Sequence, residues 1–335
     1  MESQSRRHIQ DGCASSKHPR HREPARTHPP WQHGIAGLVS GIFTESILHP
    51  LDLVKTRMQV QRSGIALPGV QHYNNLMSAF PTIIRNEGVL ALYKGIRPNL
   101  VGSGVAWGSY FCVYNFVKSV WSKHQNPDEE LGPVHHLTSA AFAGLTTCCI
   151  TNPILMVKTR LQLQFQTAHS NVYDYKGMVD AFQRIISEEG FLALYRGLGA
   201  AMTLVSNGAL QFMAYEQLKR FTLDFIVDGE ESTLKPIHFL AMGGIAKMFS
   251  VSITYPLQVT RSRLYQRQLP GVTGPDAGHY LYKSARDVWR QIYLYDGFTG
   301  FYRGLSLQFL KSVPSSALTF LAYEEVLRLF KESAY

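Results

Sequence analysis

The chain contains a ten-residue stretch, Pro50-Leu-Asp52-Leu-Val-Lys55-Thr-Arg57-Met-Gln59, that recurs twice with substitutions. The second copy reads Pro153-Ile-Leu155-Met-Val-Lys158-Thr-Arg160-Leu-Gln162, and the third reads Pro256-Leu-Gln258-Val-Thr-Arg261-Ser-Arg263-Leu-Tyr265. The prolines at 50, 153 and 256 are evenly spaced by 103 residues. A fixed period of this length predicts a supersecondary unit that is repeated three times.

A second motif follows each copy of the first. An acid and a glycine (Glu87-Gly88, Glu189-Gly190, Asp296-Gly297) precede an aromatic-base-Gly triplet that ends at Gly95, Gly197 or Gly304. We therefore expect each unit to contain an apolar helix that ends in the Pro motif, a polar connection, and a second apolar helix after the last glycine.

The apolar stretches are long enough to cross a membrane. Residues 100–117, 137–157 and 198–215 contain no charge, and 34–53, 237–260 and 305–323 contain one or two. Uncharged runs of about 18 residues or more are typical of transmembrane helices. The fold predicted from them is an all-α membrane protein with six transmembrane helices. The mean hydropathy of −0.09 hides this class, because Gly, Ser, Thr and Pro occur inside the stretches.

The composition limits the other possibilities. The 335 residues would suggest about two domains, but the period divides the chain into repeats at 34–130, 131–232 and 233–335, within one integrated domain. Residues 1–33 are basic and lack an apolar run, so we expect a disordered tail and no secretory signal. The net charge of +9 favours anionic partners. The four cysteines form no CxxC pair, so we expect neither a metal site nor a disulfide scaffold.

No pattern in the sequence indicates an enzyme. The histidines are scattered and no GxxxxGK[ST] loop is present, so we expect no catalytic residue and no cofactor. A soluble helical repeat that binds nucleic acid is the alternative from another class, although we expect no nucleic-acid partner. Alkaline carbonate extraction would separate the two, since it releases a soluble protein and retains an integral one.

The tripled pair of motifs resembles the mitochondrial carrier family, over about residues 30 to 330. The resemblance implies a threefold pseudosymmetric barrel of six helices around a central substrate cavity. It implies a monomer in the mitochondrial inner membrane, with the Pro motifs toward the matrix. Lys and Arg gather at the ends of the first, third and fifth helices, where the positive-inside rule places them on the side that is not translocated.

The resemblance also implies a matrix gate, in which the acid at Pro+2 pairs with the base at Pro+5 of the next repeat. The acid positions hold Asp52, Leu155 and Gln258, and the base positions hold Lys55, Lys158 and Arg261. Only Asp52 and Lys158 can form a full ion pair, and Gln258 can offer a hydrogen bond. Gln59 and Gln162 match the family's bracing positions, whereas Tyr265 does not. The six bases of the three motifs outnumber their one acid, and we expect this excess to attract an anion.

A second gate is implied at the other end of the barrel. The family pattern there is aromatic-acid-x-x-base, and Asn115 and Leu327 break it. The residues that match it are Lys118, Glu216, Lys219 and Glu324. We expect Glu324 to pair with Lys118.

Departures from the threefold symmetry indicate the substrate site. Lys247 stands where the other units have Gly41 and Gly144, and a lysine inside a membrane helix is functional by default. By resemblance, the substrate contact points lie near Lys311 and its equivalents, Gly102 and Leu204 or Thr203. Arg261 belongs to the same third of the barrel. Trp107 and Asn207 could receive a flat ring, although Trp107 fits simple helix packing equally well.

These residues predict an organic anion with one negative end and one flat polar end. Folate and FAD fit this description, and so do nucleotides and related molecules such as NAD and coenzyme A. The segments at 102–111 and 208–216 resemble the folate/FAD carrier branch of the family. That branch tends to have Trp at the position of Leu155. The resemblance also implies cardiolipin and membrane lipid bound near Gly95, Gly197 and Gly304, where helix N-termini offer backbone N–H groups to phosphate.

Overall fold

The computed structural model describes residues 30–61, 73, 76–124, 132–164, 175–225, 236–266, 282 and 284–332. Residues 1–29, which make up most of the predicted tail, lie outside this part of the chain. The described residues form helices and connecting turns, with no strand among them. The predicted all-α class is confirmed.

The same order of helices occurs three times. The first repeat contains α1 (Pro30–Val60), α2 (Leu76–Glu87), the 3-10 helix η1 (Val89–Tyr93) and α3 (Ile96–His124). The second contains α4 (Pro133–Gln162), α5 (Met178–Glu189), η3 (Phe191–Tyr195), α6 (Leu198–Thr203) and α7 (Ser206–Phe225). The third contains α8 (Pro236–Tyr265), α9 (Ala285–Tyr295), η6 (Phe298–Tyr302) and α10 (Leu305–Glu332). Each Pro motif lies at the end of a long helix, as the sequence predicts.

The first helix begins earlier than expected. The boundary predicted from composition places residues 30–33 in the tail, but α1 starts at Pro30. Proline is favoured in the first turn of a helix because its missing N–H would have no partner there. In addition, the ring nitrogen Nδ1 of His33 lies 2.7 Å from the hydroxyl of Tyr323 on α10. These contacts assign residues 30–33 to the folded part of the chain.

The helix predicted over 198–215 is interrupted between α6 and α7. The N–H of Val205 donates to Met202, and the N–H of Asn207 donates to Leu204, so the backbone tightens to i→i−3 bonds. The Thr203 hydroxyl donates to the Ala200 carbonyl and the Ser206 hydroxyl to the Thr203 carbonyl. Such side-chain bonds compete with the regular helix ladder, and here they coincide with the break.

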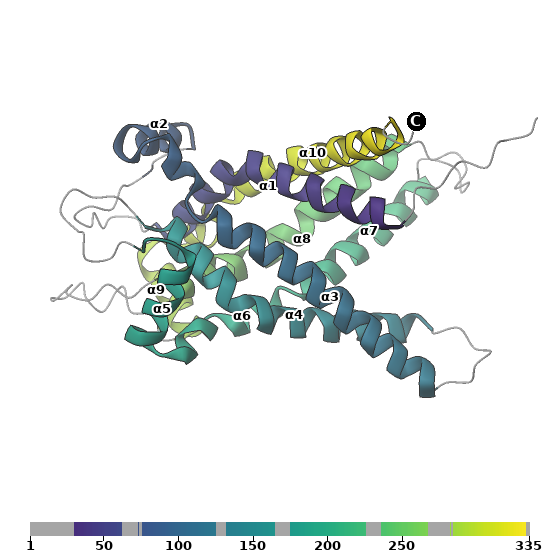
Figure 1. The fold of residues 1–335 in the computed structure, drawn as a ribbon, viewed down its shortest axis with the longest axis horizontal. Helices are drawn as coiled ribbons and strands as arrows, with labels where there is room; N and C mark the ends of the chain where they lie inside the picture. Colours follow the sequence, from purple (N-terminus) through teal and green to yellow (C-terminus); the bar gives the residue numbers. More distant parts are fainter. Residues whose placement is uncertain are drawn as a thin grey trace, which may run out of the picture.

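The long helices pack in pairs that join different repeats. Thus α3 lies along α4, α7 along α8, and α1 along α10, while α1, α4 and α8 also meet one another. We call the end with the Pro motifs and the short helices the motif end, and the opposite end the far end. The short helices α2, α5 and α9 lie at the left of Figure 1, whereas α3 and α10 end far apart at its right. Buried residues concentrate at the motif end of α1, α4 and α8, so the helices are closely packed there.

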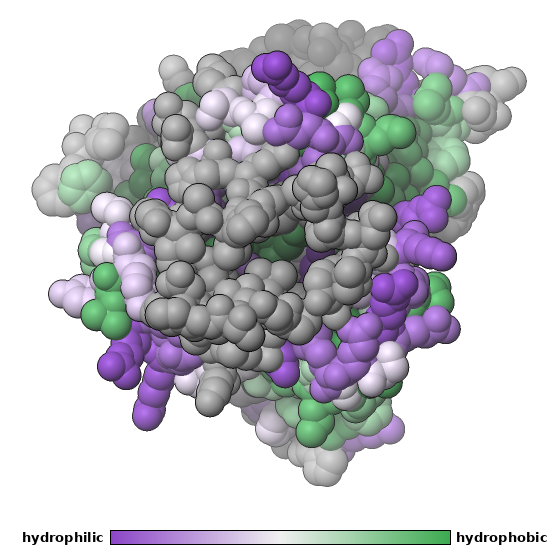
Figure 2. Space-filling model, turned by 90° about the vertical axis from the view of Figure 1, so that its left-hand side faces the viewer, coloured by the Kyte–Doolittle hydropathy of each residue, from purple (hydrophilic) through white to green (hydrophobic). Residues whose placement is uncertain are grey.

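Three described helices, α1, α4 and α8, are individually long and apolar enough to cross a membrane. Large apolar side chains along them are exposed, among them Leu38, Phe142 and Leu240. An apolar surface of this extent indicates contact with lipid. The motif end, seen face-on in Figure 2, has hydrophilic side chains around its rim, as expected of a surface outside the hydrocarbon layer.

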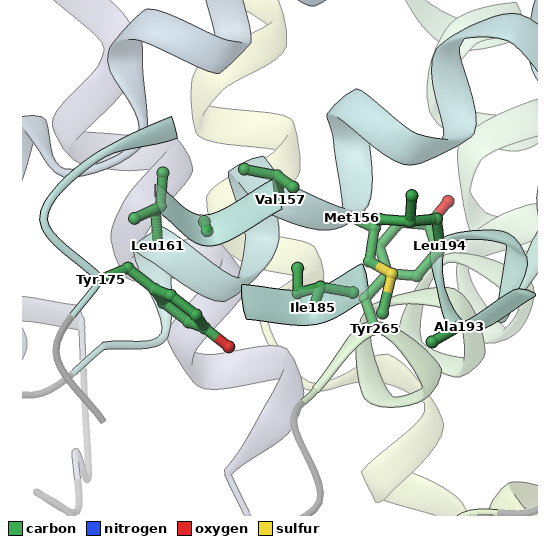
Figure 3. Close-up of a cluster of buried hydrophobic side chains, with 9 residues drawn as sticks. Met156, Val157, Leu161, Tyr175, Ile185, Ala193, Leu194 and Tyr265 are labelled. Atoms are coloured by element: carbon green, nitrogen blue, oxygen red, sulfur yellow. The ribbon is translucent and has the colours of Figure 1, made fainter. Parts of the chain in front are cut away.

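Three equivalent apolar clusters attach the short helices to the Pro motifs. In the second repeat, Met156 and Val157 of α4 pack with Ile185 of α5 and Leu194 of η3 (Figure 3). Tyr265 enters this cluster from α8 of the next repeat. The corresponding clusters in the other two repeats contain Val54 with Ile83, and Val259 with Ile292. The clusters hold the motif end as one packed layer.

Candidate functional site

Asp52 is the centre of a network of charges at the motif end. Its Oδ2 atom lies 2.7 Å from Nζ of Lys158 and accepts a 3.2 Å hydrogen bond from Nε2 of Gln162. Its Oδ1 atom lies 3.3 Å from Nζ of Lys311. The structure thus brings together the two residues that were expected to pair, with Gln162 beside them.

Lys311 has a different environment from the one predicted. We expected it to face the substrate, but its ammonium group lies between Asp52 and Glu45, 3.5 Å from Oε2 of the latter. Oε2 of Glu45 also accepts a 2.9 Å hydrogen bond from Asn99 on α3. In this arrangement the charge of Lys311 is balanced by carboxylates, so it belongs to the network around Asp52.

The other positions of the predicted matrix gate form no ion pair within the described part of the chain, although Lys55 lies near the charges of Asp52 and Lys311. Lys55 donates to the side-chain oxygen of Gln308 on α10, and not to Gln258 as expected. Gln258 makes no hydrogen bond to another described residue. Leu155 packs against the apolar cluster of the second repeat. Asp52 is therefore the only residue at the three acid positions that forms an ion pair within the described part of the chain.

A ring of backbone contacts that the sequence did not predict joins the three repeats. Nε of each Pro+7 arginine donates to the carbonyl oxygen at Pro+9 of the next repeat. Arg57 donates to Gln162 at 2.9 Å, Arg160 to Tyr265 at 3.2 Å, and Arg263 to Gln59 at 3.2 Å. The circle is closed, because the third repeat returns to the first. The only indication of this ring in the sequence is that all three copies of the Pro motif have a base at Pro+7.

The same arginines are paired with acids of their own repeats. Arg57 binds both carboxylate oxygens of Glu87, at 2.5 and 2.9 Å, and both side chains are fully buried. Arg160 likewise binds both carboxylate oxygens of Glu189, whereas Arg263 donates from Nη2 to Oδ2 of Asp296 at 2.7 Å. Burial acts to raise the pKa of Glu87, but the hydrogen bonds and charge of Arg57 outweigh it and leave this pKa below its usual value. These acids offset the charge of three of the six motif bases, but each acid also contacts a second base, Lys94, Arg196 or Arg303, so an excess of basic groups remains.

The glycines that end the second motifs have positive φ angles of 82° at Gly95, 78° at Gly197 and 87° at Gly304. A Cβ atom at Gly95 would lie 2.9 Å from Cγ of Gln162, and one at Gly197 would lie 2.9 Å from Cε1 of Tyr265. Gly304 similarly faces Tyr255 and Gln59. The three glycines therefore allow the Pro+9 side chain of a neighbouring repeat to approach the backbone, and their binding of lipid stays a prediction.

We expect Gly197→Ala to destabilise the protein, because alanine would combine an unfavourable φ with contact to the rigid Tyr265 ring. Strain of this kind costs about 1–3 kcal/mol, and a thermal unfolding scan in detergent measures it. Gly199→Ala is the matched control, since Gly199 has nothing within 4 Å of its Cβ position. Equal melting temperatures for the two variants would contradict the close approach.

Two cations of the third repeat differ from Lys311 in having only neutral partners among the described residues. Nζ of Lys247 donates to the side-chain oxygen of Gln211 on α7 at 3.1 Å. The guanidinium of Arg261 lies 5.9 Å from the centre of the Tyr265 ring. Both side chains are half-buried. They are available to bind an anion without first losing a carboxylate partner.

The uncharged residues that were predicted to contact the substrate lie in different surroundings. Gly102 is buried, and a Cβ atom there would lie 3.2 Å from Cγ2 of Ile154 on α4, while its contact with the substrate stays a prediction. Thr203 and Leu204 lie at the break before α7. The side-chain amide of Asn207 is bound to Thr254 at 2.6 Å.

Trp107 is 65% exposed and stacks on Phe111. It occupies the same face of α3 as Lys118, because helix positions 7 and 11 residues apart align. This face is the one on which the family resemblance places a residue of the far gate.

The residues of the predicted far gate lie on three helices: Lys118 on α3, Glu216 and Lys219 on α7, and Glu324 on α10. Lys118 and Glu324 are both exposed and form no ion pair within the described part of the chain. The structure therefore shows close packing at the motif end and no Glu324–Lys118 pair at the far end.

The repeats, the Pro motifs and the ring of arginines correspond to a known protein family. The sequence profile of the mitochondrial carrier protein family matches residues 26–125, 129–225 and 232–334. The chain belongs to the mitochondrial carrier family. It is therefore a solute transporter with three carrier repeats, and the family's members are multi-pass membrane proteins.

Three relatives show the range of molecules transported within the family. The chain is 42% identical over 308 residues to folate transporter 1, chloroplastic, of Arabidopsis thaliana, covering 90% of this chain and 96% of the relative. It is 32% identical to the mitochondrial nicotinamide adenine dinucleotide transporter 2 of the same plant, covering 89% and 79%. It is 30% identical to a mitochondrial pyrimidine nucleotide transporter of Saccharomyces cerevisiae, covering 90% and 86%.

Proposed function

We propose that this carrier moves an organic anion, with folate as the first candidate and FAD as the second, by alternating access through a central cavity. The observation that carries the proposal is the pair of half-buried cations Lys247 and Arg261, which have neutral partners. A charged group inside a membrane helix is costly unless it faces a polar interior and has a function. Both lie on α8, 14 residues and therefore about 21 Å apart along its axis, so we propose that they contact different parts of the anion, or successive positions of it, on one side of the cavity.

The identity of the cargo rests on the relatives and on the chemistry of the site. Folate is favoured because the 42% identical relative is a folate transporter. The NAD and pyrimidine nucleotide transporters support the alternative of a nucleotide-like cargo, and coenzyme A belongs to the same alternative. All of these molecules have negative groups and a flat heterocycle.

In the proposed cycle, cargo enters from the far end and binds Lys247 and Arg261. The network around Asp52 then has to open, and the interaction of the cargo with Lys158 and Lys311 offsets the loss of their ion pairs. A ligand shifts such an equilibrium only by its difference in affinity between the two states. We propose that the second state is closed at the far end by the Glu324–Lys118 pair.

The proposed far gate can be tested by exchanging its charges. We expect Lys118→Glu and Glu324→Lys each to reduce transport, since each places two like charges at the closing contact. The double exchange is expected to recover most of the uptake into proteoliposomes, because opposite charges face each other again. If the double variant is no more active than the single variants, the two residues do not pair.

A thermal-shift panel on the purified carrier tests which anion is bound. A ligand that binds the folded state raises the melting temperature, by an amount that grows with its concentration relative to Kd. We expect folates to give the largest shift among folate, FAD, NAD, pyrimidine nucleotides and coenzyme A. A larger shift with NAD or a nucleotide would support a nucleotide-like cargo in place of folate.

For its location, we propose the mitochondrial inner membrane, with a monomeric carrier that binds cardiolipin. The family and the mitochondrial relatives support this location, whereas the folate relative is named as chloroplastic. Subcellular fractionation decides between the two organelles. Comparing melting temperatures with and without added cardiolipin tests the lipid.

A further inference from the structure

We propose that Glu45 is a specificity residue that binds a pair of adjacent N–H donors on the ring of the cargo. This inference rests on the proposed function, because it assigns the uncharged end of the same anion. Glu45 lies on α1 among membrane-spanning residues, and Cys148 and Val251 occupy its positions in the other two repeats. The acid is therefore not required by the threefold symmetry of the fold.

The carboxylate of Glu45 is held in place but not fully used. Its Oε2 atom accepts from Asn99 at 2.9 Å and lies 3.5 Å from Nζ of Lys311. Oε1 makes no hydrogen bond to a described residue. The side chain is 29% exposed, and Gly41, one turn away on the same face of α1, has nothing within 4 Å of its Cβ position. One oxygen thus remains accessible beside open space.

Balancing the charge of Lys311 accounts for Oε2 of Glu45 but leaves Oε1 unused. Nζ of Lys311 lies nearer to Asp52, at 3.3 Å, and Asp52 is more buried than Glu45. A second acid at this point lowers the attraction of the site for an anion. Such a cost is explained if the part of the cargo that reaches Glu45 is not negative but donates hydrogen bonds.

An ionised carboxylate only accepts hydrogen bonds, and its two oxygens match two parallel donors. Oε1 of Glu45 is open, and Oε2 can take the second donor if the cargo displaces Lys311 from its 3.5 Å contact while Asn99 keeps its hydrogen bond. A 2-amino-4-oxopyrimidine edge, as in pterins, presents this pair, since an amino group stands next to a ring N–H. The pyrimidine edge of a flavin has one N–H between two carbonyls, and adenine places its amino group beside a ring acceptor. Glu45 therefore favours a pterin-type cargo over flavin and adenine compounds.

The test uses two ring compounds that differ at one position. Pterin-6-carboxylate has the 2-amino group, and lumazine-6-carboxylate has oxygen in its place. Binding is measured directly on the purified full-length carrier by competition or calorimetry. We expect the wild type to bind the pterin at least tenfold more tightly, because sites built around a donor reject analogues that lack it. In Glu45→Gln we expect the two affinities to agree within about threefold.

Two controls separate recognition from folding. Glu325→Gln removes an exposed carboxylate of α10, 66% exposed, and should leave the wild-type preference intact. p-Aminobenzoylglutamate, which has the anionic half of folate without the ring, should bind Glu45→Gln at least as well as wild type. Its binding shows that the variant is folded and that its cation site is intact.

The results of this test bear separately on the role of Glu45 and on folate as the cargo. A wild-type carrier that binds the two ring compounds equally, or neither, overturns the role of Glu45, and so does an unchanged preference in Glu45→Gln. If the preference is present and depends on Glu45 but folate is not taken up by proteoliposomes, the proposed cargo fails while the assignment of Glu45 stands.

Discussion

Arg57→Ala is expected to lower the free energy of unfolding by about 3–5 kcal/mol, because removing one member of a buried ion pair leaves the other charge uncompensated. Glu87 would remain buried with Lys94, at 3.2 Å, as its remaining ion-pair partner within the described part of the chain. The contact from Nε to the Gln162 carbonyl, which joins the first repeat to the second, would also be lost. We expect a melting temperature in detergent roughly 5–10 °C below that of the wild type.

Two comparisons make this prediction specific. Arg184→Ala removes a partly exposed pair with Asp180 on one helix, and exposed pairs of this kind contribute at most about 1 kcal/mol. Arg57→Met combined with Glu87→Leu removes both buried charges and should recover a large part of the stability. If Arg57→Ala melts within a degree of Arg184→Ala, the ring of arginines does not hold the repeats together.

Lys247→Gln and Arg261→Gln are each expected to reduce uptake of folate from a dilute solution by roughly 30-fold or more. Losing a charged partner of a desolvated anion costs about 2–5 kcal/mol, and each 1.4 kcal/mol is a factor of ten. The melting temperatures should stay near that of the wild type, since neither side chain has an acidic partner among the described residues that it would leave unpaired.

Arg328→Gln provides the control for these variants, because Arg328 is a 68% exposed cation at the far end of α10. We expect it to transport normally. Lys311→Ala, in contrast, should lower both uptake and stability, since Asp52 and Glu45 would lose a shared partner. A stable Lys311→Ala carrier would show that the network around Asp52 does not depend on this lysine.

The fold was predictable from the sequence because its signals are local and repeated. Pro50, Pro153 and Pro256 recur at one period, and each lies inside a long helix, in the turns before its C-terminal end. The Asp52–Lys158 contact was implied by the family resemblance, in which the acid of one repeat pairs with the base of the next. The ring of arginines belongs to this regular part as well, although its acceptors are backbone carbonyls and leave no trace in residue types.

The departures from symmetry were harder to interpret. Lys311 could be recognised as unusual, but its partner Glu45 is 266 residues away in the chain and lies outside any motif. The break before α7 coincides with hydroxyl groups that bond to the backbone, but the same bonds occur inside unbroken helices, so residue types did not predict it. Ile154 of α4 lies next to Gly102. The surroundings of Lys311 and Gly102 depend on contacts between helices, which the order of residues in the chain does not reveal.

The most direct measurement of the central claim is uptake of labelled folate by liposomes that contain the purified carrier. The wild-type chain is compared with the Lys247→Gln/Arg261→Gln double variant at equal protein and at matched melting temperature. We predict saturable accumulation with the wild type and only background accumulation with the double variant. Equal accumulation by the two proteins would contradict the assigned anion site, and the absence of uptake by the wild type would contradict folate as the cargo.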